Sequence, residues 1–328
     1  MTMNTQALSM TTPKHASLTR TISMHRVLAT ILFLLVLPWI MPNYSVATHI
    51  LIIGLYALGF NLVFGYMGML SFGHAAFLGV GAYAAGILIS QYQTIWWIAI
   101  PAAILVAAFV ALLIGVLAIR TRGIYFAMVT LALAQCVFFL VYQFPPSGGE
   151  NGLRGVNISQ LHVFGLSFDM LNPIVKYYFF LCFVALALWL ISRVLASPFG
   201  AVIQAIRENE PRARACGFNV ENTKLITFVL SGAFCGLAGA LNAINLSSVA
   251  IETLHYETSG LVVMICLLGG MGTFFGPLLG ALLFLLIQDV FSLWTEHWQL
   301  YVGAIFIIFV LFFPKGVWGT ILEKLHVD

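Results

Sequence analysis

Long apolar runs separated by short polar segments fill the chain from residue 27 to residue 313. A helix that crosses the hydrocarbon core of a bilayer needs about 20 predominantly apolar residues, and most of these runs approach that length. The pattern therefore predicts about ten transmembrane helices. The predicted spans are residues 27–40, 46–64, 71–90, 95–118, 124–144, 174–196, 225–245, 258–270, 277–293 and 299–313.

The composition places these helices in a membrane. Of the 328 residues, 61% are apolar and 8% are charged, whereas soluble domains carry about a quarter charged residues. We predict an all-α integral membrane protein, a polytopic bundle whose membrane domain covers residues 25–320, between a polar tail at 1–24 and a short tail at 321–328. The net charge of +3 is too small an excess to indicate nucleic-acid binding. The five cysteines form no CxxC pair, so we expect neither a disulfide nor a metal site.

The positions of the cations predict the topology. Ten spans place both termini on one side, and with both in the cytoplasm the cations gather on the inner side, as the positive-inside rule requires. The inner cations are Lys14, Arg20, Arg26, Arg120, Arg122, Arg193, Arg207, Arg212, Arg214, Lys224, Lys315 and Lys324. Only Arg154 and Lys176 fall outside. Residues 1–40 superficially resemble a secretion signal, but the apolar core lies unusually far from the start and we expect no cleavage.

The predicted spans hold almost no ionisable side chain at mid-depth. Ion-coupled carriers usually place such side chains there as relays, so the pattern argues against a secondary transporter. Carriers that bind sodium through backbone carbonyls need no buried charge, and this alternative stays open. We interpret the polar residues near spans, such as Asn61, mainly as interhelical hydrogen-bonding groups.

Two glycine-rich segments, residues 65–83 and 268–281, interrupt the apolar runs near opposite ends of the chain. Glycine and proline at membrane depth free backbone groups, which is tolerated only where protein or a watery cavity satisfies them. These broken segments therefore suggest a pathway, although each single glycine fits close helix packing or a cytoplasmic turn equally well. The candidate pathway or gating residues are Asn61, Gly65, Gly68, Ser71, Gly73, His74, Gly269, Gly270, Gly272 and Gly276.

Within the first segment, small residues recur at spacings of three and four. Ala75, Gly79, Ala82 and Gly86 share one helical face, and we expect a neighbouring helix to approach it closely. His74 precedes this face and could titrate near neutrality. We interpret it instead as a hydrogen-bonded structural histidine at the start of a helix.

Residues 198–224 bring charges of both signs together in a chain that otherwise avoids them. The pattern predicts a short amphipathic helix parallel to the membrane, from which Arg207 points away. Pro211 ends or restarts this helix, and Gly217 is a plausible C-terminal cap. The residues predicted to share the apolar face are Ala201, Val202, Ala205 and Ile206. The alternative is a solvated loop that only sets orientation.

Five separated motifs together resemble one family of membrane proteins. They are GLYALGFNLVFGYMGMLSFGHAAFLGVGAYAA (54–85), SGGENGLRGV (147–156), SPFGAVIQAIRENEPRARACGFNV (197–220), LLGGMGTFFGPLLGA (267–281) and FFPKGVWG (312–319). In this order they resemble the permease family of branched-chain amino acid ABC importers, specifically its LivM-type subunits. The resemblance covers most of the chain from Val27 to Thr320.

The resemblance implies a pore-forming half of an importer in the bacterial inner membrane. It implies three kinds of partner: a second permease of the LivH type, two cytoplasmic ATP-binding subunits and a periplasmic substrate-binding protein. The chain contains no G-x-x-x-x-G-K-[ST] phosphate loop. We therefore expect ATP and Mg²⁺ on the partner ATPase, with no cofactor and no catalytic residue on this chain.

By the same resemblance, the loop from Ala201 to Gly217 is the coupling helix that inserts into the ATPase surface. The coupling residues are Arg207, Glu208, Glu210, Arg212, Arg214 and Gly217. The sequence departs from the EAA pattern of other importers, because Glu210 and Gly217 lie one residue further apart and Pro211 replaces the first alanine. The resemblance therefore implies the docking role of this loop, and it indicates the individual contacts less directly.

The substrate class is less strongly indicated than the family. Related permeases handle urea, short amides or aromatic acids, so the hypothesis of leucine, isoleucine and valine stands beside that of urea or a short amide. A self-sufficient secondary carrier and a structural membrane scaffold are the interpretations from other classes. Neither explains the charged inside loop together with the order of the motifs.

Overall fold

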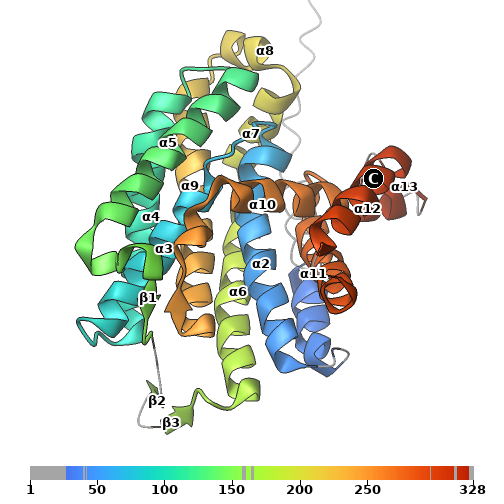
Figure 1. The fold of residues 1–328 in the computed structure, drawn as a ribbon. Helices are drawn as coiled ribbons and strands as arrows, with labels where there is room; N and C mark the ends of the chain where they lie inside the picture. The colour runs from blue at the N-terminus through green and yellow to red at the C-terminus, as the bar shows by residue number, and fades with distance from the viewer. Residues whose placement is uncertain are drawn as a thin grey trace, which may run out of the picture.

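The computed structural model describes residues 27–39, 41, 43–156, 160–163, 166–295, 297–313 and 316–324. The predicted polar tail and the cations Lys14, Arg20, Arg26 and Lys315 lie outside these residues, as do the last four residues of the predicted C-terminal tail. Figure 1 shows a bundle of helices with α7 and α8 at one end and the strands β2 and β3 at the other.

The structure is built almost entirely from helices. They are Val27–Trp39, α2 (Tyr44–Asn61), the π-helix η1 (Leu62–Tyr66), α3 (His74–Ser90), α4 (Trp96–Ala118), α5 (Ile124–Gln143), α6 (Pro173–Leu195), α7 (Pro198–Glu208), α8 (Glu210–Ala215), α9 (Val220–Leu246), α10 (Tyr256–Gly269), α11 (Gly276–Trp294), α12 (Trp298–Phe312) and α13 (Gly316–Lys324). The predicted boundary between membrane domain and tail, at residue 320, falls inside α13.

Each predicted span coincides with an apolar helix. Among the described residues, seven helical segments are long and apolar enough to cross a membrane. They are Tyr44–Tyr66, Trp96–Ala118, Ile124–Gln143, Pro173–Leu195, Val220–Leu246, Gly276–Trp294 and Gln299–Thr320. The helices Val27–Trp39, α3 and α10 are also apolar but shorter. The chain is therefore an all-α membrane protein, as its composition predicts.

Short strands lie at the end of the bundle opposite α7 and α8 (Figure 1). The strands β2 (Gln160–Val163) and β3 (Leu166–Asp169) pair as an antiparallel hairpin, with Gln160 opposite Asp169. The strands β1 (Leu153–Arg154) and β4 (Ser248–Val249) pair antiparallel and join the segments that precede α6 and α10. We call this the hairpin end, and the opposite one the α7–α8 end.

Small residues bring α9 into close contact with the helices around it. A Cβ added to Gly81 of α3 would overlap the backbone of Gly236, and one added to Gly239 would overlap the carbonyl oxygen of Leu78. Where neither helix carries a side chain, two backbones approach to van der Waals distance. This contact places the first glycine-rich segment against the centre of the bundle.

The predicted small face of α3 is confirmed in part, because the N–H of Ala75 donates to the hydroxyl of Ser259 on α10 over 2.8 Å. A Cβ at Gly79 would meet Leu254, and one at Gly86 would meet Leu153 and Val249, which belong to the connections at the hairpin end. The close approach of α9 uses Gly81 and also reaches Ala82 of the predicted face, whose backbone nitrogen would lie 2.9 Å from a Cβ added to Gly239. Nearly every residue of α3 is buried, so both faces need small residues and the spacing alone could not distinguish them.

Candidate functional site

The two glycine-rich segments interlock through one side chain, that of Asn61 at the end of α2. Its Nδ2 donates to the carbonyl oxygen of Thr273 over 3.0 Å, and its Oδ1 accepts from the backbone N–H of Gly272 over 3.1 Å. Gly65 lies in η1 directly beneath this contact, and a Cβ there would overlap both Asn61 Oδ1 and the nitrogen of Gly272. The absence of a side chain at Gly65 therefore admits the second segment.

The second segment is a tight turn between α10 and α11. Gly270 and Gly272 both have positive φ, at +117° and +71°, which favours glycine. The hydroxyl of Thr273 donates to the carbonyl oxygen of Gly270 over 2.8 Å and accepts from the N–H of Gly276 over 3.1 Å, so it caps the start of α11. Gly316, the first residue of α13, packs on Gly270, which brings the last of the five motifs to the same turn.

His74 begins α3 and is fully buried. Its Nδ1 lies 3.1 Å from the hydroxyl of Ser71, and its Nε2 lies 2.9 Å from the hydroxyl of Ser231 on α9. The Ser231 hydroxyl donates to the carbonyl oxygen of Gly59, and the Ser71 hydroxyl accepts from the N–H of Gly73. Because the Ser231 hydroxyl donates its hydrogen to Gly59, it accepts from Nε2 of His74, which therefore carries the ring hydrogen. Nδ1 can then accept from the Ser71 hydroxyl, so a neutral imidazole satisfies both bonds. Three rings stand edge-on to the imidazole, those of Phe60, Phe77 and Phe228.

The charged loop folds into α7 and α8 as two short helices. Asn209 interrupts them with an extended backbone, and its side chain caps α8 by accepting from the N–H of Arg212 over 2.9 Å. Pro211 lies in the first turn of α8, where its missing N–H is tolerated. Gly217 takes a φ of +87° just past the end of α8. The predicted restart at Pro211 and the predicted cap at Gly217 are both confirmed.

The predicted apolar face of α7 is only partly correct, since Ile206 is buried but Val202 and Ala205 are half-buried. Ile203 and Ile206 are buried, whereas Ala201 is exposed to solvent. The predicted face therefore needs correction, because the helix turns the larger Ile203 inward. The small methyl group of Ala201 has less to gain from leaving water.

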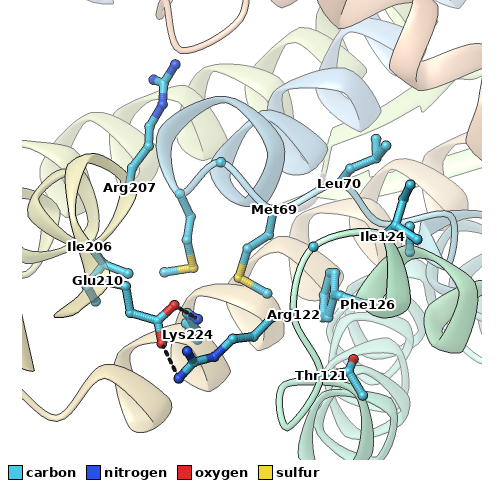
Figure 2. Close-up of a pocket in the computed structure, with 14 residues that line it drawn as sticks. Met69, Leu70, Thr121, Arg122, Ile124, Phe126, Ile206, Arg207, Glu210 and Lys224 are labelled. Atoms are coloured by element: carbon cyan, nitrogen blue, oxygen red, sulfur yellow. Dashed lines mark hydrogen bonds and ion pairs between the residues drawn. The ribbon is translucent and has the colours of Figure 1, made fainter.

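Glu210 is the centre of an ion network that ties α8 to two other elements. Its carboxylate lies 2.8 Å from Nζ of Lys224 on α9, 3.3 Å from Arg122 in the connection between α4 and α5, and 3.5 Å from Arg214. Partial burial disfavours the charged carboxylate, but the hydrogen bond and charge of Lys224, with the charges of Arg122 and Arg214, hold the pKa of Glu210 below its usual value. Figure 2 shows Arg122 and Lys224 converging on Glu210.

Arg207 extends in the opposite direction from this network (Figure 2). A Cβ added to Gly68 would lie 3.1 Å from Cγ of Arg207, and one added to Gly272 would lie 2.8 Å from its Nη1. Gly68 belongs to the first glycine-rich segment and Gly272 to the second. One side chain of α7 thus touches both segments at the point where Asn61 joins them.

A cavity of about 360 Å³ separates Arg207 from the Glu210 network. Met69 and Leu70 of the first segment form one wall, and Ile124 and Phe126 of α5 form another. Glu208 and Arg212 are exposed and lie outside its lining.

Several of the predicted site residues therefore gather in two neighbouring groups at the α7–α8 end, whereas Ser71, Gly73 and His74 belong to the separate hydrogen-bonded chain that reaches Ser231. Asn61, Gly65, Gly68 and the turn around Gly272 meet beside Arg207, and Glu210 and Arg214 share the ion network. Sequence reasoning missed Thr273, Ser231 and Thr130, whose hydroxyl accepts from the N–H of Phe72 over 3.2 Å. In the sequence these residues are marked only by a hydroxyl group inside or beside an apolar run. Such hydroxyl groups are too common to identify a functional residue.

Comparison with known families matches residues 44–312 to the family described as "Branched-chain amino acid transport system / permease component". The chain belongs to this family of permeases. The match spans α2 to α12 and includes both glycine-rich segments and the charged loop.

Individual relatives agree with this assignment. The permease is 31% identical over 293 residues to the high-affinity branched-chain amino acid transport system permease protein LivM of Escherichia coli K12, a match that covers 83% of this chain and 69% of the relative. It is 23% identical to a probable LivM permease of Methanocaldococcus jannaschii, over 77% of this chain and 83% of the relative. It is 22% identical to LivH of Escherichia coli K12, over 81% and 90%. No solved structure matches the chain.

Proposed function

We propose that this permease forms one half of the translocation pathway of an ATP-driven importer of branched-chain amino acids. The observation that carries the proposal is membership of the branched-chain amino acid permease family over residues 44–312. The names of the relatives include two permeases, LivM and LivH, which supports a heterodimeric pore with a LivH-type second permease. Two cytoplasmic ATPase subunits, which would hold ATP and Mg²⁺, and a periplasmic binding protein complete the proposed assembly in the bacterial inner membrane.

The proposed topology has ten crossings and both ends in the cytoplasm. The α7–α8 end carries Arg122, Arg207, Arg214 and Lys224, as expected of a cytoplasmic side, whereas Glu252 and Glu257 lie toward the hairpin end. The seven long helices and the three shorter apolar ones together provide the ten crossings. The hairpin end then faces the periplasm.

In the proposed mechanism, α7 and α8 are the coupling element. Closure of the ATPase dimer would press on this end. Arg207 contacts Gly68 of the first glycine-rich segment and Gly272 of the second, and it would pass the movement to both segments. Asn61 would then hold or release the interlocked segments, which act as the inner gate of an alternating-access pathway. Glu208 and Arg212, which are exposed, are available to contact the ATPase.

The test is uptake into proteoliposomes that contain both permeases and the ATPases, with the binding protein added outside. We expect ATP-dependent uptake of leucine, isoleucine and valine but not of urea. Because Arg207 links α7 to both segments, Arg207→Ala should lower leucine uptake by about fivefold or more, with assembly of the complex unchanged. The matched control is Arg120→Ala, an exposed arginine at the same end.

Three results would contradict the proposal. Uptake of urea without leucine would change the substrate class. Transport by this chain alone under an ion gradient would make it a secondary carrier. Equal uptake by the Arg207→Ala and Arg120→Ala variants would remove the coupling role of Arg207.

A further inference from the structure

An open groove runs along α10, α11 and α12 on a side of the bundle that the coupling elements do not use. It holds about 870 Å³, within the range of about 300–1,000 Å³ typical of small-molecule sites. One end is lined by Glu252 and Glu257, near the start of α10. The lining also includes Phe72 of the first glycine-rich segment. The groove thus connects the hairpin end to the interlocked segments.

Two glycines of this groove have no packing explanation within the chain. Gly260 on α10 and Gly303 on α12 both line it, and a Cβ added to either would meet no atom within 4 Å. The other glycines for which the structure describes open space have positive φ, at Gly123, Gly155 and Gly217. A helix with glycine at an interior position is less stable than one with alanine there. Since neither contacts nor backbone conformation require them, Gly260 and Gly303 keep space open for something outside this chain.

The lining of the groove has a polar part and an apolar part. Glu252 and Glu257 supply carboxylates, Gln299 supplies an amide, and no lysine or arginine is among the described lining residues. Nδ1 of His255 is shielded from solvent without a hydrogen-bond partner. Toward the middle of α10 and α12 the lining becomes apolar, with side chains such as Met264 and Phe306. This order suits a small solute with an ammonium group at one end and an aliphatic body.

We propose that this groove is the half-site through which the solute passes on this subunit, and that it takes an α-amino acid with an aliphatic side chain. The ammonium group lies near Glu252 and Glu257, the carboxylate accepts from donors such as the Gln299 amide, and the aliphatic part contacts Met264 and Phe306. The groove is only partly enclosed by this chain, so the second permease supplies the missing wall. This inference rests on the proposed function and assigns its solute site.

The experiment places a large side chain in the groove at Gly303, where a Cβ would meet no atom of this chain. Gly303→Leu places an aliphatic side chain where the solute would lie, and Ala304→Leu is the matched control, because Ala304 is the next residue of α12, is exposed and does not line the groove. Leucine uptake is measured in the proteoliposomes described above, and assembly is measured by size-exclusion chromatography. We expect both variants to assemble, with uptake by Gly303→Leu reduced about tenfold or more and uptake by Ala304→Leu unchanged.

A second variant tests the charges without altering the volume. The double substitution Glu252→Gln and Glu257→Gln should lower the maximal rate of leucine uptake at saturating binding protein, because the ammonium group loses its charged partners. An unchanged maximal rate would overturn the placement of the ammonium group. Normal uptake by Gly303→Leu would remove the groove from the pathway.

Loss of assembly in Gly303→Leu, with Ala304→Leu intact, would also overturn the solute site, because it would show that a partner helix occupies the groove. Failure of the proposed function is distinguishable from all of these results. In that case the unmodified complex would not import leucine at all.

Discussion

The side-chain amide of Asn61 joins two parts of the chain that lie 211 residues apart. It is almost fully buried, at 1% exposure, and both its oxygen and its Nδ2 are hydrogen-bonded to the backbone of the second segment. A buried amide left without partners is costly, so the turn at Gly272 and the end of α2 stabilise each other. Gly65 makes this pairing sterically permissible.

At this scale we predict that Gly65→Ala separates the two segments. The new methyl group would overlap Asn61 Oδ1 and the backbone nitrogen of Gly272, and overpacking of this kind costs about 1–3 kcal/mol. The melting temperature of the purified permease in detergent should fall. Gly260→Ala is the control for stability, because its methyl group enters open space. Equal melting temperatures for the two variants would show that the segments do not depend on Gly65.

Ser231→Ala tests the hydrogen-bonded chain through His74. The substitution removes the acceptor of the His74 Nε2 hydrogen and the donor to the Gly59 carbonyl oxygen. The Gly59 carbonyl oxygen still accepts from the N–H of Leu62, but the buried Nε2–H of His74 is left unpaired at a cost of about 1–3 kcal/mol, so the melting temperature should drop. Ser292→Ala is the matched control, since the Ser292 hydroxyl donates to a backbone carbonyl oxygen at an exposed site. A drop of similar size in both variants would contradict the role of this chain of bonds.

At the scale of elements, α8 illustrates how a six-residue helix is stabilised. Asn209 caps its start, Gly217 ends it, and Glu210 fixes it to Lys224 on α9. Lys224 is 8% exposed in its side chain, so its charge needs the carboxylate close by. The helix is therefore attached by charge as well as by its short apolar face.

The ion network predicts a pH dependence for this attachment. The pKa of Glu210 is lower in the folded protein than its usual value, so the stabilisation is present above the usual carboxyl pKa and is lost as the pH falls through the lowered one. Glu210→Gln should therefore melt at a lower temperature than the unmodified permease at neutral pH, and the difference should shrink as the solution becomes more acidic. Glu208→Gln, at an exposed carboxylate, serves as the control. A gap that stays constant with pH would contradict the network.

At the scale of the whole molecule, the two ends of the bundle differ in composition and packing. The α7–α8 end holds the ion network, Arg207 and the interlocked segments, and the groove begins at the hairpin end. A solute that entered the groove would meet Phe72, the neighbour of Gly73 in the first segment. The arrangement thus places the proposed gate between the groove and the coupling helices.

The orientation of these ends can be measured by cysteine labelling. Cys216 is exposed beside α8, whereas Cys235 and Cys266 are buried. We expect a membrane-impermeant maleimide to label Cys216 only after the cells are permeabilised, because the proposed topology places the α7–α8 end in the cytoplasm. Gln91→Cys, in the connection from α3 to α4 at the other end, should react in intact spheroplasts. The Cys216→Ser variant identifies the label, and reaction of Cys216 in intact spheroplasts would reverse the topology.

Local signals in the sequence were sufficient for the helices and their ends. Hydropathy located every apolar helix because burial in lipid requires continuous apolar runs. Pro211 and Gly217 marked the boundaries of α8, because proline fixes φ in a first helical turn and glycine permits the positive φ that ends a helix. Ala201 was placed on the wrong face because helical periodicity does not identify which of two adjacent faces the membrane domain covers.

The amino-acid sequence alone predicts the membrane class, the positions of the helices, the family and the residues from which a site could be chosen. The partners of these residues follow from the fold: Asn61 pairs with Gly272, Glu210 with Lys224, and Arg207 contacts both glycine-rich segments. The open groove at Gly260 and Gly303 also emerged only there. The sequence does not predict these partners because hydropathy and backbone preferences act within a single turn or span. Contacts between distant segments depend on how all the helices pack together.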